Sequence, residues 1–375
     1  MLRKLLFILF INFLLSSCIV FKSTRPSLQN NNVSFYKINK IVEKYPQLPW
    51  DQFTIVFLKK YYKYKPEDMK FMLLKGGYSE DALFKVNLLS KNYILRFIGL
   101  NRPKNDRDFI IQSFVWAGSN NFGPKVYLYD KDSTFLLMDF LEGKTLELKD
   151  TKNASILKSL GKTLFKIHNA PNPKSNIRQM SQFTIGRDWY LSVKNTKRKY
   201  FGPSILKVAY NHWLKLNKEV NETSYKNSML HNDPNLRNVL WNGKKIFLLD
   251  WELAGLADPR KELAHICAWY GLNDKLTDVF LSSYLKRKPS FQELLINEKM
   301  KKIILLEFAW VGLSSLKNHI SINDWDSFYA KAGPKTVEDL SLIQINSESK
   351  PSDETLRIIY LGLIKQFIIK VTKDK

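Results

Sequence analysis

The stretch SMLHNDPNLRNVLW, residues 228–241, places a histidine, an aspartate and several asparagines between two apolar runs. His231, Asp233 and Asn238 are spaced as H-x-D-x-x-x-x-N, and Asp250 ends the next apolar run, in LLDWELA. A loop aspartate can accept the proton of an attacking hydroxyl, while amide and carboxylate oxygens can hold Mg²⁺ against nucleotide phosphates. The spacing therefore predicts a phosphoryl-transfer site with Asp233 as the base and with Asn238 and Asp250 as metal ligands.

The length and composition of the chain are those of a globular protein with one large domain or two lobes. The 375 residues are 45% hydrophobic and 13% aromatic, and 59 basic against 35 acidic residues give a net charge of +24. That charge suits a nucleic acid, an anionic membrane or a phosphorylated ligand. The lysines are scattered, as in KKYYKYK and NTKRKYF, and no recognised nucleic-acid-binding signature accompanies them, which disfavours a nucleic-acid partner.

The N-terminus has the layout of a targeting segment. Residues 1–20, MLRKLLFILFINFLLSSCIV, run from basic to apolar to small residues, and LSSC resembles the lipobox of bacterial lipoproteins. Cleavage there would make Cys18 the mature N-terminus, whereas the alternative is an uncleaved membrane anchor. Residues 21–34 form a predicted tether. We expect membrane association through this segment; use of ATP would favour a cytoplasmic catalytic body, and the sequence leaves the side open.

The character of the body changes near residue 142. Strands are predicted before it, where apolar and β-branched residues alternate or cluster, at 70–77, 81–89, 92–100, 125–130 and 134–140. Helical patterns lie at 35–68, 106–117, 157–170 and 355–371, and a further strand-like stretch lies at 220–230. We therefore expect an α+β fold with a strand-rich, nucleotide-binding N-lobe at 35–141 and a mainly helical C-lobe at 142–375.

The loop and the LLDWE segment together resemble a known group of enzymes. The H-x-D-x-x-x-x-N pattern is related to the catalytic loop of kinases, and LLDWE stands where protein kinases have D-F-G. The combination resembles the aminoglycoside phosphotransferase and choline/ethanolamine kinase superfamily, in particular its choline kinase branch. Asn232, Trp251 and Glu252 depart from the protein-kinase residues, and LADPRKELA resembles the D-P-x-x-D-L-A segment of the superfamily, with Glu262 at its aspartate. This resemblance implies a bilobal protein-kinase-like fold.

Upstream motifs follow in the order that the resemblance implies. LKGGYSEDALFKV resembles the hairpin over the nucleotide phosphates, where Gly76 and Gly77 would let backbone N–H groups approach the anion. Arg96, in YILRF, stands where protein kinases place a phosphate-binding lysine. The helix that should offer Arg96 an acidic partner contains Asp108 and Gln112 but no glutamate, which leaves that pairing open.

The stretch LLMDFLEGKTL resembles the hinge between the lobes. The backbone of Asp139, Phe140 and Leu141 would there form hydrogen bonds with the adenine edge. His231 has two possible roles, since it could hold the catalytic loop in place or act directly in catalysis.

The acceptor site is the least defined by the sequence. ILLEFAWVGLSSLKN resembles the tryptophan-bearing helix of choline kinases, so Phe308 and Trp310, with Trp269 and Tyr270, could face a quaternary ammonium through cation–π attraction. The alternative is ordinary core packing. Glu252 could face a cationic substrate, or could lie in or behind the metal site.

The resemblance implies transfer of the γ-phosphoryl group of ATP, with Mg²⁺, to the hydroxyl of a small alcohol. Choline or ethanolamine is the first candidate, and an aminoglycoside, thiamine or a sugar are alternatives of the same class. A different class stays open, a catalytically silent kinase-like module at a membrane surface, because an exported lipoprotein would meet little ATP. A third is a binder of anionic surfaces driven by the +24 charge.

Overall fold

The computed structural model describes residues 35–61, 63–74, 81–173, 177–179, 203–315, 327, 329–336 and 352–373. The predicted targeting segment with Cys18, the tether up to residue 34, and Gly76 and Gly77 lie outside the described residues.

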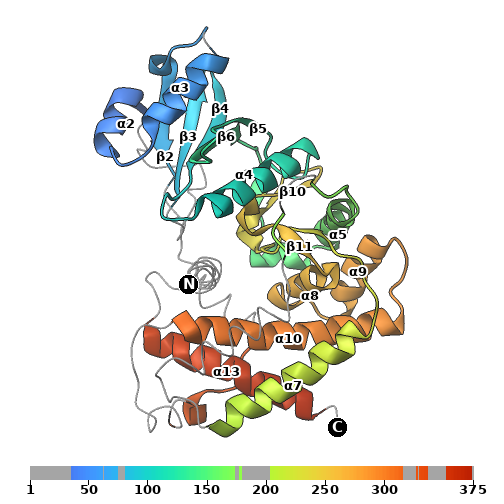
Figure 1. The fold of residues 1–375 in the computed structure, drawn as a ribbon. Helices are drawn as coiled ribbons and strands as arrows, with labels where there is room; N and C mark the ends of the chain where they lie inside the picture. The colour runs from blue at the N-terminus through green and yellow to red at the C-terminus, as the bar shows by residue number, and fades with distance from the viewer. Residues whose placement is uncertain are drawn as a thin grey trace.

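An antiparallel sheet forms the N-terminal part (Figure 1). Its strand order is β1-β2-β3-β4-β6-β5, and it contains β1 (Tyr36–Lys37), β2 (Met69–Leu73), β3 (Ala82–Leu88), β4 (Lys91–Phe97), β5 (Val126–Tyr129) and β6 (Phe135–Asp139). The five strands predicted before residue 142 are all present in this sheet, and β1 is an addition that the sequence pattern did not suggest.

One face of this sheet is covered by α3 (Trp50–Lys60), with α2 (Ile38–Lys44) beside it. Trp50 packs edge-on against Phe71, Phe84 and Phe97, with ring centroids 5.6, 5.3 and 4.7 Å away. Because side chains alternate along a strand, Arg96, which precedes Phe97, faces the opposite side of the sheet. Burial of the aromatic face thus directs Arg96 toward the rest of the molecule.

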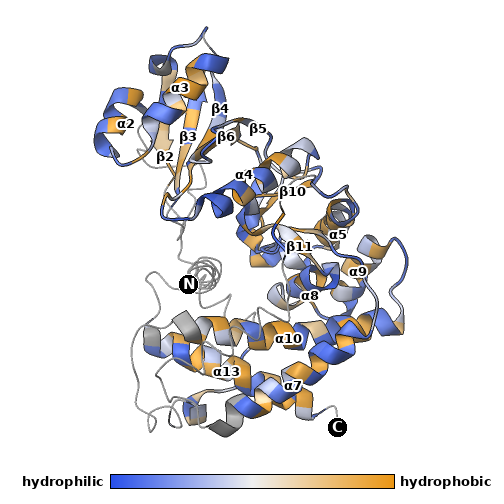
Figure 2. Ribbon diagram, in the orientation of Figure 1, coloured by the Kyte–Doolittle hydropathy of each residue, from blue (hydrophilic) through white to orange (hydrophobic). Residues whose placement is uncertain are grey.

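Helices build most of the remaining chain (Figure 1). They are α4 (Lys104–Ser119), α5 (Ala154–His168), α7 (Pro203–Asn221), α8 (Pro259–Trp269), α9 (Asp274–Leu285), α10 (Phe291–Ser315) and α13 (Asp353–Thr372). α7, α10 and α13 pack together at the end far from the sheet, and Figure 2 shows hydrophobic residues along α10 and α13. None of the helices among the described residues is long and apolar enough to cross a bilayer.

Short elements lie between the helices and carry the loop of interest. They are η1 (Pro66–Asp68), β7 (Lys144–Thr145), η2 (Leu148–Lys152), β8 (Ser228–Leu230), η3 (Leu236–Asn238), β9 (Val239–Trp241), β10 (Ile246–Leu248), η4 (Trp251–Leu253) and β11 (Gly255–Ala257). β9 pairs with β10 and with β7, and β8 pairs with β11. The architecture is the predicted α+β kinase-like one, a small antiparallel sheet followed by a mainly helical part.

The strand predicted at 220–230 is wrong over most of its length. α7 continues to Asn221, and only Ser228–Leu230 forms a strand. Trp213, Leu216 and Val220 are buried at helical spacing on α7. The buried stripe keeps residues 220 and 221 in α7, and residues 222–227, which are polar and mostly exposed, form neither helix nor strand.

Candidate active site

The catalytic loop joins β8 to η3 and holds its aspartate from two sides. Asn238 Nδ2 donates to Asp233 Oδ2 at 2.8 Å and to the Asp233 carbonyl at 3.1 Å. Asn235 Nδ2 donates to Asp233 Oδ1 at 3.0 Å. Asp233 and Asn238 are both buried. Two amide groups of the same loop therefore orient both oxygens of the predicted base.

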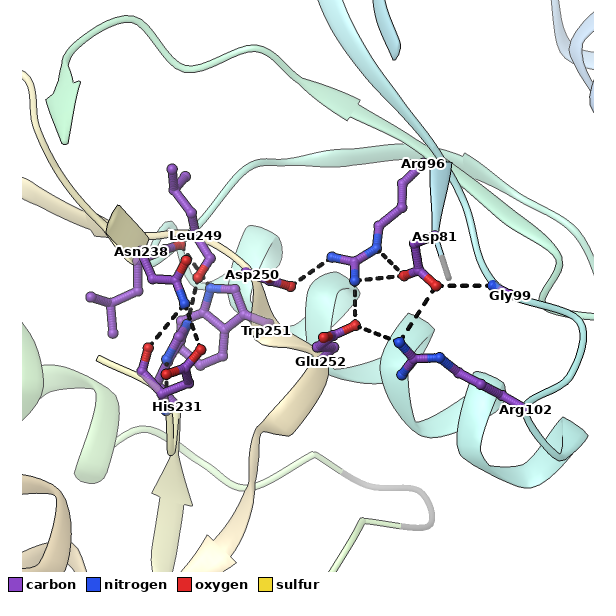
Figure 3. A network of polar contacts seen from close by, with 12 residues as sticks. Asp81, Arg96, Gly99, Arg102, His231, Asn238, Leu249, Asp250, Trp251 and Glu252 are labelled. Carbon is purple, nitrogen blue, oxygen red and sulfur yellow. Dashed lines mark hydrogen bonds and ion pairs between the residues drawn. The ribbon is translucent and has the colours of Figure 1, made fainter. Parts of the chain in front are cut away.

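His231 links this loop to the strand that leads to Asp250 (Figure 3). Its Nε2 donates to the Leu249 carbonyl at 2.6 Å, and its Nδ1 accepts from the Asp233 N–H at 3.3 Å. The ring also meets Trp251 edge-on, with centroids 4.8 Å apart. Burial lowers the pKa of His231 and keeps the ring neutral. These contacts favour the structural role over direct catalysis.

Asp250 lies beside the loop because of a backbone contact and an unusual conformation. The Leu249 N–H donates to the Asn238 carbonyl at 2.7 Å, which brings the two segments together. Asp250 itself has φ 61° and ψ 67°, the left-handed region that a residue with a side chain rarely adopts. Its side chain is 36% exposed. The predicted metal ligands Asn238 and Asp250 therefore come from adjacent backbones.

The donor atoms of this pair fit Mg²⁺. The NH₂ group of Asn238 is directed at Asp233, so the amide oxygen points the other way, and Asp250 offers a partly exposed carboxylate. Mg²⁺ is usually held by one or two carboxylates together with waters and substrate phosphates. Within the described residues no cluster of three or more His, Cys, Asp and Glu side chains could hold a metal by itself. The ion would thus need the phosphates of a nucleotide to complete its shell.

Arg96 is the centre of an ion-pair network (Figure 3). Its Nε donates to Asp81 Oδ2 at 2.6 Å, its Nη1 donates to Asp250 Oδ1 at 2.6 Å, and its Nη2 donates to the Glu252 carboxylate. Burial alone would lower the pKa of Arg96, but the charges of these three carboxylates raise it well above its usual value. Arg96 is therefore a permanent cation in front of Asp250.

Asp108, the acidic group that the sequence offered from the helix, is not the partner of Arg96. Lys104 Nζ donates to Asp108 Oδ1 at 2.9 Å, and Ser133 Oγ donates to the same oxygen at 2.6 Å. Asp108 thus binds a lysine of α4 itself and a serine from the turn between β5 and β6. Asp81 takes its place, and no motif in the sequence marked Asp81 for that role.

Glu252 belongs to the arginine network rather than to an acceptor pocket. Besides Arg96 it accepts from Arg102 Nη2 at 3.2 Å, and its side chain is buried. Arg178 Nη1 donates to the Glu252 carbonyl at 3.3 Å, and its Nη2 reaches Asp106 Oδ1 at 3.4 Å. The pKa of Glu252 is raised, first by burial and then by the nearby carboxylate of Asp250, and the charges of Arg96 and Arg102 offset only part of this rise. The sequence patterns singled out neither Arg102 nor Arg178.

The hinge segment lies at the end of β6. The Asp139 N–H donates to the Lys125 carbonyl at 2.9 Å, and Tyr127 Oη donates to Asp139 Oδ1 at 2.9 Å. Lys85, buried on β3, places its Nζ 4.2 Å from the centroid of the Phe140 ring. Leu141 then leads out of the sheet. The backbone predicted to meet adenine is thus fixed to the sheet at its first residue.

Helix α8 anchors the catalytic loop from the other side. Glu262 Oε1 accepts from the Asn232 N–H at 2.6 Å, and Glu262 Oε2 lies 2.7 Å from His168 Nε2. Tyr270, just after α8, donates its hydroxyl to the Pro234 carbonyl at 2.9 Å. Tyr270 therefore stabilises the catalytic loop through this hydrogen bond.

The other predicted acceptor aromatics form two separate clusters. Trp269 and Phe308 lie together, with ring centroids 5.1 Å apart. Trp310 instead packs against Trp213 of α7, 5.6 Å away, and is fully buried. The structure thus brings Trp269 and Phe308 into contact but assigns Trp310 to the packing between α7 and α10.

Comparison with known families decides the class of this site. A family model described as the phosphotransferase enzyme family matches residues 70–294, more than half of the chain. The chain belongs to this family. The resemblance drawn from the loop and DWE motifs is thereby confirmed, and so is the predicted enzyme class, a small-molecule kinase that uses a nucleotide.

Curated relatives are distant. The chain is 27% identical over 165 residues to the protein LicA homolog of Metamycoplasma hominis, a match of 44% of this chain and 61% of that protein. It is 27% identical over 213 residues to protein LicA of Haemophilus influenzae, a match of 56% of this chain and 77% of that protein. The chain thus spans less than two thirds of the length of the first relative.

Solved structures share the fold. A choline/ethanolamine kinase family protein from Mesorhizobium loti matches with a TM-score of 0.55 and 16% identity, over 76% of this chain and 90% of that one. Plasmodium vivax ethanolamine kinase matches with a TM-score of 0.55 and 15% identity, over 92% of this chain and 97% of that one. A spectinomycin phosphotransferase in complex with ADP and spectinomycin matches with a TM-score of 0.51 and 15% identity, over 84% of this chain and 99% of that one. Because the sequence identities are this low, these matches show a shared fold and nothing about the substrate.

Proposed function

We propose that the protein transfers the γ-phosphoryl group of ATP, with Mg²⁺, to the hydroxyl of a small cationic alcohol, with choline or ethanolamine first. The observation that carries this proposal is the buried, hydrogen-bonded pair of Asp233 and Asn238 beside the left-handed Asp250. The likeness in fold to a choline/ethanolamine kinase family protein supports the choice of acceptor.

Each part of the site has a task in this reaction. Asp233, held by Asn235 and Asn238, orients the acceptor hydroxyl and takes its proton as the oxygen attacks phosphorus. The amide oxygen of Asn238 and the carboxylate of Asp250 hold Mg²⁺, which when bound offsets charge on the phosphates. Arg96 supplies a fixed positive charge for the same phosphates.

The remaining nucleotide contacts are proposed from the sequence motifs. The backbone of residues 139–141 would bind the adenine edge, and the N–H groups at Gly76 and Gly77 would approach the phosphates. His231 acts in this scheme as a positioning group, since its ring nitrogens are engaged with the Leu249 carbonyl and the Asp233 N–H.

A buried carboxylate on α10 supports a cationic acceptor. Glu307 is buried, and its Oε2 lies 3.1 Å from Lys261 Nζ. Lys261 precedes Glu262, which binds the catalytic loop, so Glu307 lies one helix away from that loop. Its neighbour in sequence is Phe308, whose ring meets that of Trp269 at an angle of 37°. α10 thus carries both a buried carboxylate and an aromatic ring, and both kinds of group attract an ammonium ion.

The activity is tested with the full chain and a panel of alcohols. ADP release from ATP and Mg²⁺ is measured with choline, ethanolamine, thiamine, an aminoglycoside and a sugar. We expect choline or ethanolamine to give the highest kcat/KM, with turnover lost on removal of Mg²⁺ and in Asp233→Asn. Binding of ATP without turnover of any alcohol would overturn the proposal and favour the silent binding module.

The acceptor charge is tested at Glu307. Glu307→Gln should raise KM for choline about tenfold or more, because one carboxylate–ammonium contact is lost, and leave KM for ATP unchanged. Glu298→Gln is the matched control, since Glu298 is a half-exposed carboxylate on the same helix that pairs with Lys301. Equal KM values for choline in both variants would remove Glu307 from the acceptor site.

We also propose that the N-terminal segment attaches the kinase to a membrane. The apolar run at residues 5–21 and the LSSC sequence ending at Cys18 support this proposal. Incorporation of a labelled lipid precursor into the wild-type chain, and its loss in Cys18→Ser, would establish the lipoprotein route. Recovery of unlabelled, full-length chain in the membrane fraction would favour the anchor, and recovery only in the soluble fraction would refute both.

A further inference from the structure

We propose that Asp81 is the positioning residue that holds Arg96 ready for the nucleotide phosphates, in place of a carboxylate from α4. This inference rests on the proposed function, because it assigns Arg96 to the phosphates. It goes further by naming the group that fixes the guanidinium and by linking it to the segment that precedes β3.

The carboxylates in the first turns of α4 are occupied elsewhere. Asp106 lies 3.4 Å from Arg178 Nη2, and Asp108 pairs with Lys104 at 2.9 Å. What α4 offers Arg96 is the ring of Phe114, with its centroid 5.3 Å from the guanidinium carbon. The helix thus contacts the guanidinium through an aromatic ring. The orientation of the guanidinium must be set by other groups.

Asp81 takes one edge of the guanidinium. Its Oδ2 lies 2.6 Å from both Nε and Nη2 of Arg96, while Nη1 is directed at Asp250 on the opposite side. Asp250 is the partly exposed member of the set, whereas the side chains of Asp81 and Glu252 are almost completely buried. The edge of Arg96 that faces the proposed metal site is therefore Nη1, and Asp81 fixes the edge behind it.

Asp81 is itself held firmly. Its second oxygen accepts from the Gly99 N–H at 2.9 Å and lies 3.5 Å from Arg102 Nη2 (Figure 3). Both contacts come from the chain just after β4, the strand that carries Arg96. A carboxylate fixed by a backbone donor and two arginines can impose one geometry on the guanidinium, because both of its oxygens are committed.

The place of Asp81 in the sequence explains how it reaches Arg96. It directly precedes β3, in which Leu83 pairs with Arg96 across the antiparallel ladder. It also directly follows residues 74–80 of the LKGGYSEDALFKV stretch, which resembles the hairpin over the phosphates. One residue thus ties the end of that stretch to the arginine meant to bind the same phosphates.

The test compares nucleotide binding by full-length wild type, Asp81→Asn, Asp81→Glu and Asp108→Asn. Dissociation constants are measured for ATP with Mg²⁺ and for adenosine, which has no phosphates. We expect Asp81→Asn to weaken ATP binding about tenfold or more and to leave adenosine binding unchanged, since the loss falls on the phosphates. Asp81→Glu should recover part of the loss, and Asp108→Asn should bind both ligands like wild type.

Unchanged adenosine binding shows in the same experiment that Asp81→Asn is folded. Wild-type ATP affinity in Asp81→Asn, an equal loss in Asp108→Asn, or parallel losses for ATP and adenosine would each overturn the inference. Wild type that binds neither ATP nor adenosine would overturn the proposed function and the inference with it. Wild type that binds ATP but phosphorylates no alcohol would count against the proposed function alone.

Discussion

The catalytic loop and the Arg96 network are built in opposite ways. In the loop, Asp233 is held by Asn235 and Asn238, which are two and five residues away in sequence. In the network, Arg96 binds residues that are 15, 154 and 156 positions away. The loop is thus a local structure in which two amide groups hold one carboxylate, while the network consists of ion pairs, two of which join the sheet to the DWE segment. We therefore expect substitutions in the loop to lower the catalytic rate with little loss of stability, and removal of Arg96 from the network to lower the stability of the fold.

The largest expected effect is on catalysis, in the loop. Asp233→Asn should lower kcat about 10²–10⁴-fold, because removal of a positioned general base costs that much. The melting temperature should change little, since the other loop contacts of Asn235, His231 and Asn238 remain. A kcat within a few-fold of wild type would mean that another group takes the proton.

The next effect is on stability, in the network. Arg96→Met should reduce the free energy of unfolding by about 3–5 kcal/mol, because buried carboxylates lose their counter-charge. Arg287→Met is the matched control: Arg287 pairs with Glu293 at 2.7 Å but is 57% exposed, and an exposed pair of this kind contributes little to stability. Urea unfolding of both variants measures the contrast, and equal losses would show that burial does not distinguish the two pairs.

A smaller effect on stability is expected at Gly123, which packs against Trp251 of the DWE segment. A Cβ at Gly123 would lie 2.6 Å from Trp251 Nε1 and 2.9 Å from the Leu248 carbonyl, the two groups that are joined by a 2.8 Å hydrogen bond. Gly123→Ala should therefore cost about 1–3 kcal/mol. Gly333→Ala, where a Cβ meets nothing within 4 Å, should change little. Equal thermal denaturation of the two variants would contradict the tight packing behind Asp250.

The smallest effect concerns pH and the helix that anchors the loop. Burial lowers the pKa of His265 on α8 from 6.5 to about 4. The unfolded chain then binds a proton that the folded chain refuses, so stability is lost as the pH falls below 6.5, by about 1 kcal/mol between pH 6.5 and pH 5.5. His265→Phe should keep the ring packing and lose that part of the slope. An identical pH dependence of unfolding in both proteins would show that His265 does not contribute.

The sequence predicted the loop well for a physical reason. His231, Asp233 and Asn238 lie within eight consecutive residues. Side chains that are so near to each other in the sequence can meet in only a few geometries. The sheet was equally predictable, because strands such as β3 and β4 are short stretches rich in apolar residues that join through a short turn. In both cases the signal lies within one or two elements.

The acidic partner of Arg96 could not be predicted in the same way. Asp81 and Glu252 approach it through the register of β3 on β4 and through the docking of the DWE segment on the sheet, and neither distance is set by spacing in the sequence. The error at 220–230 has a different origin, because residues 222–227 are polar and mostly exposed and offer no apolar face that a sheet could bury. Trp310, whose spacing fitted an acceptor site, packs in the helical core.

The central claim is that Asn238 and Asp250 bind a metal ion that also contacts the nucleotide phosphates. The most direct measurement is a crystal structure of the protein with Mg²⁺ and a non-hydrolysable ATP analogue. The account predicts a metal about 2.0–2.1 Å from the amide oxygen of Asn238 and from the Asp250 carboxylate, with Arg96 Nη1 turned from Asp250 to a phosphate. A nucleotide bound elsewhere, or a metal held without these two side chains, would contradict it.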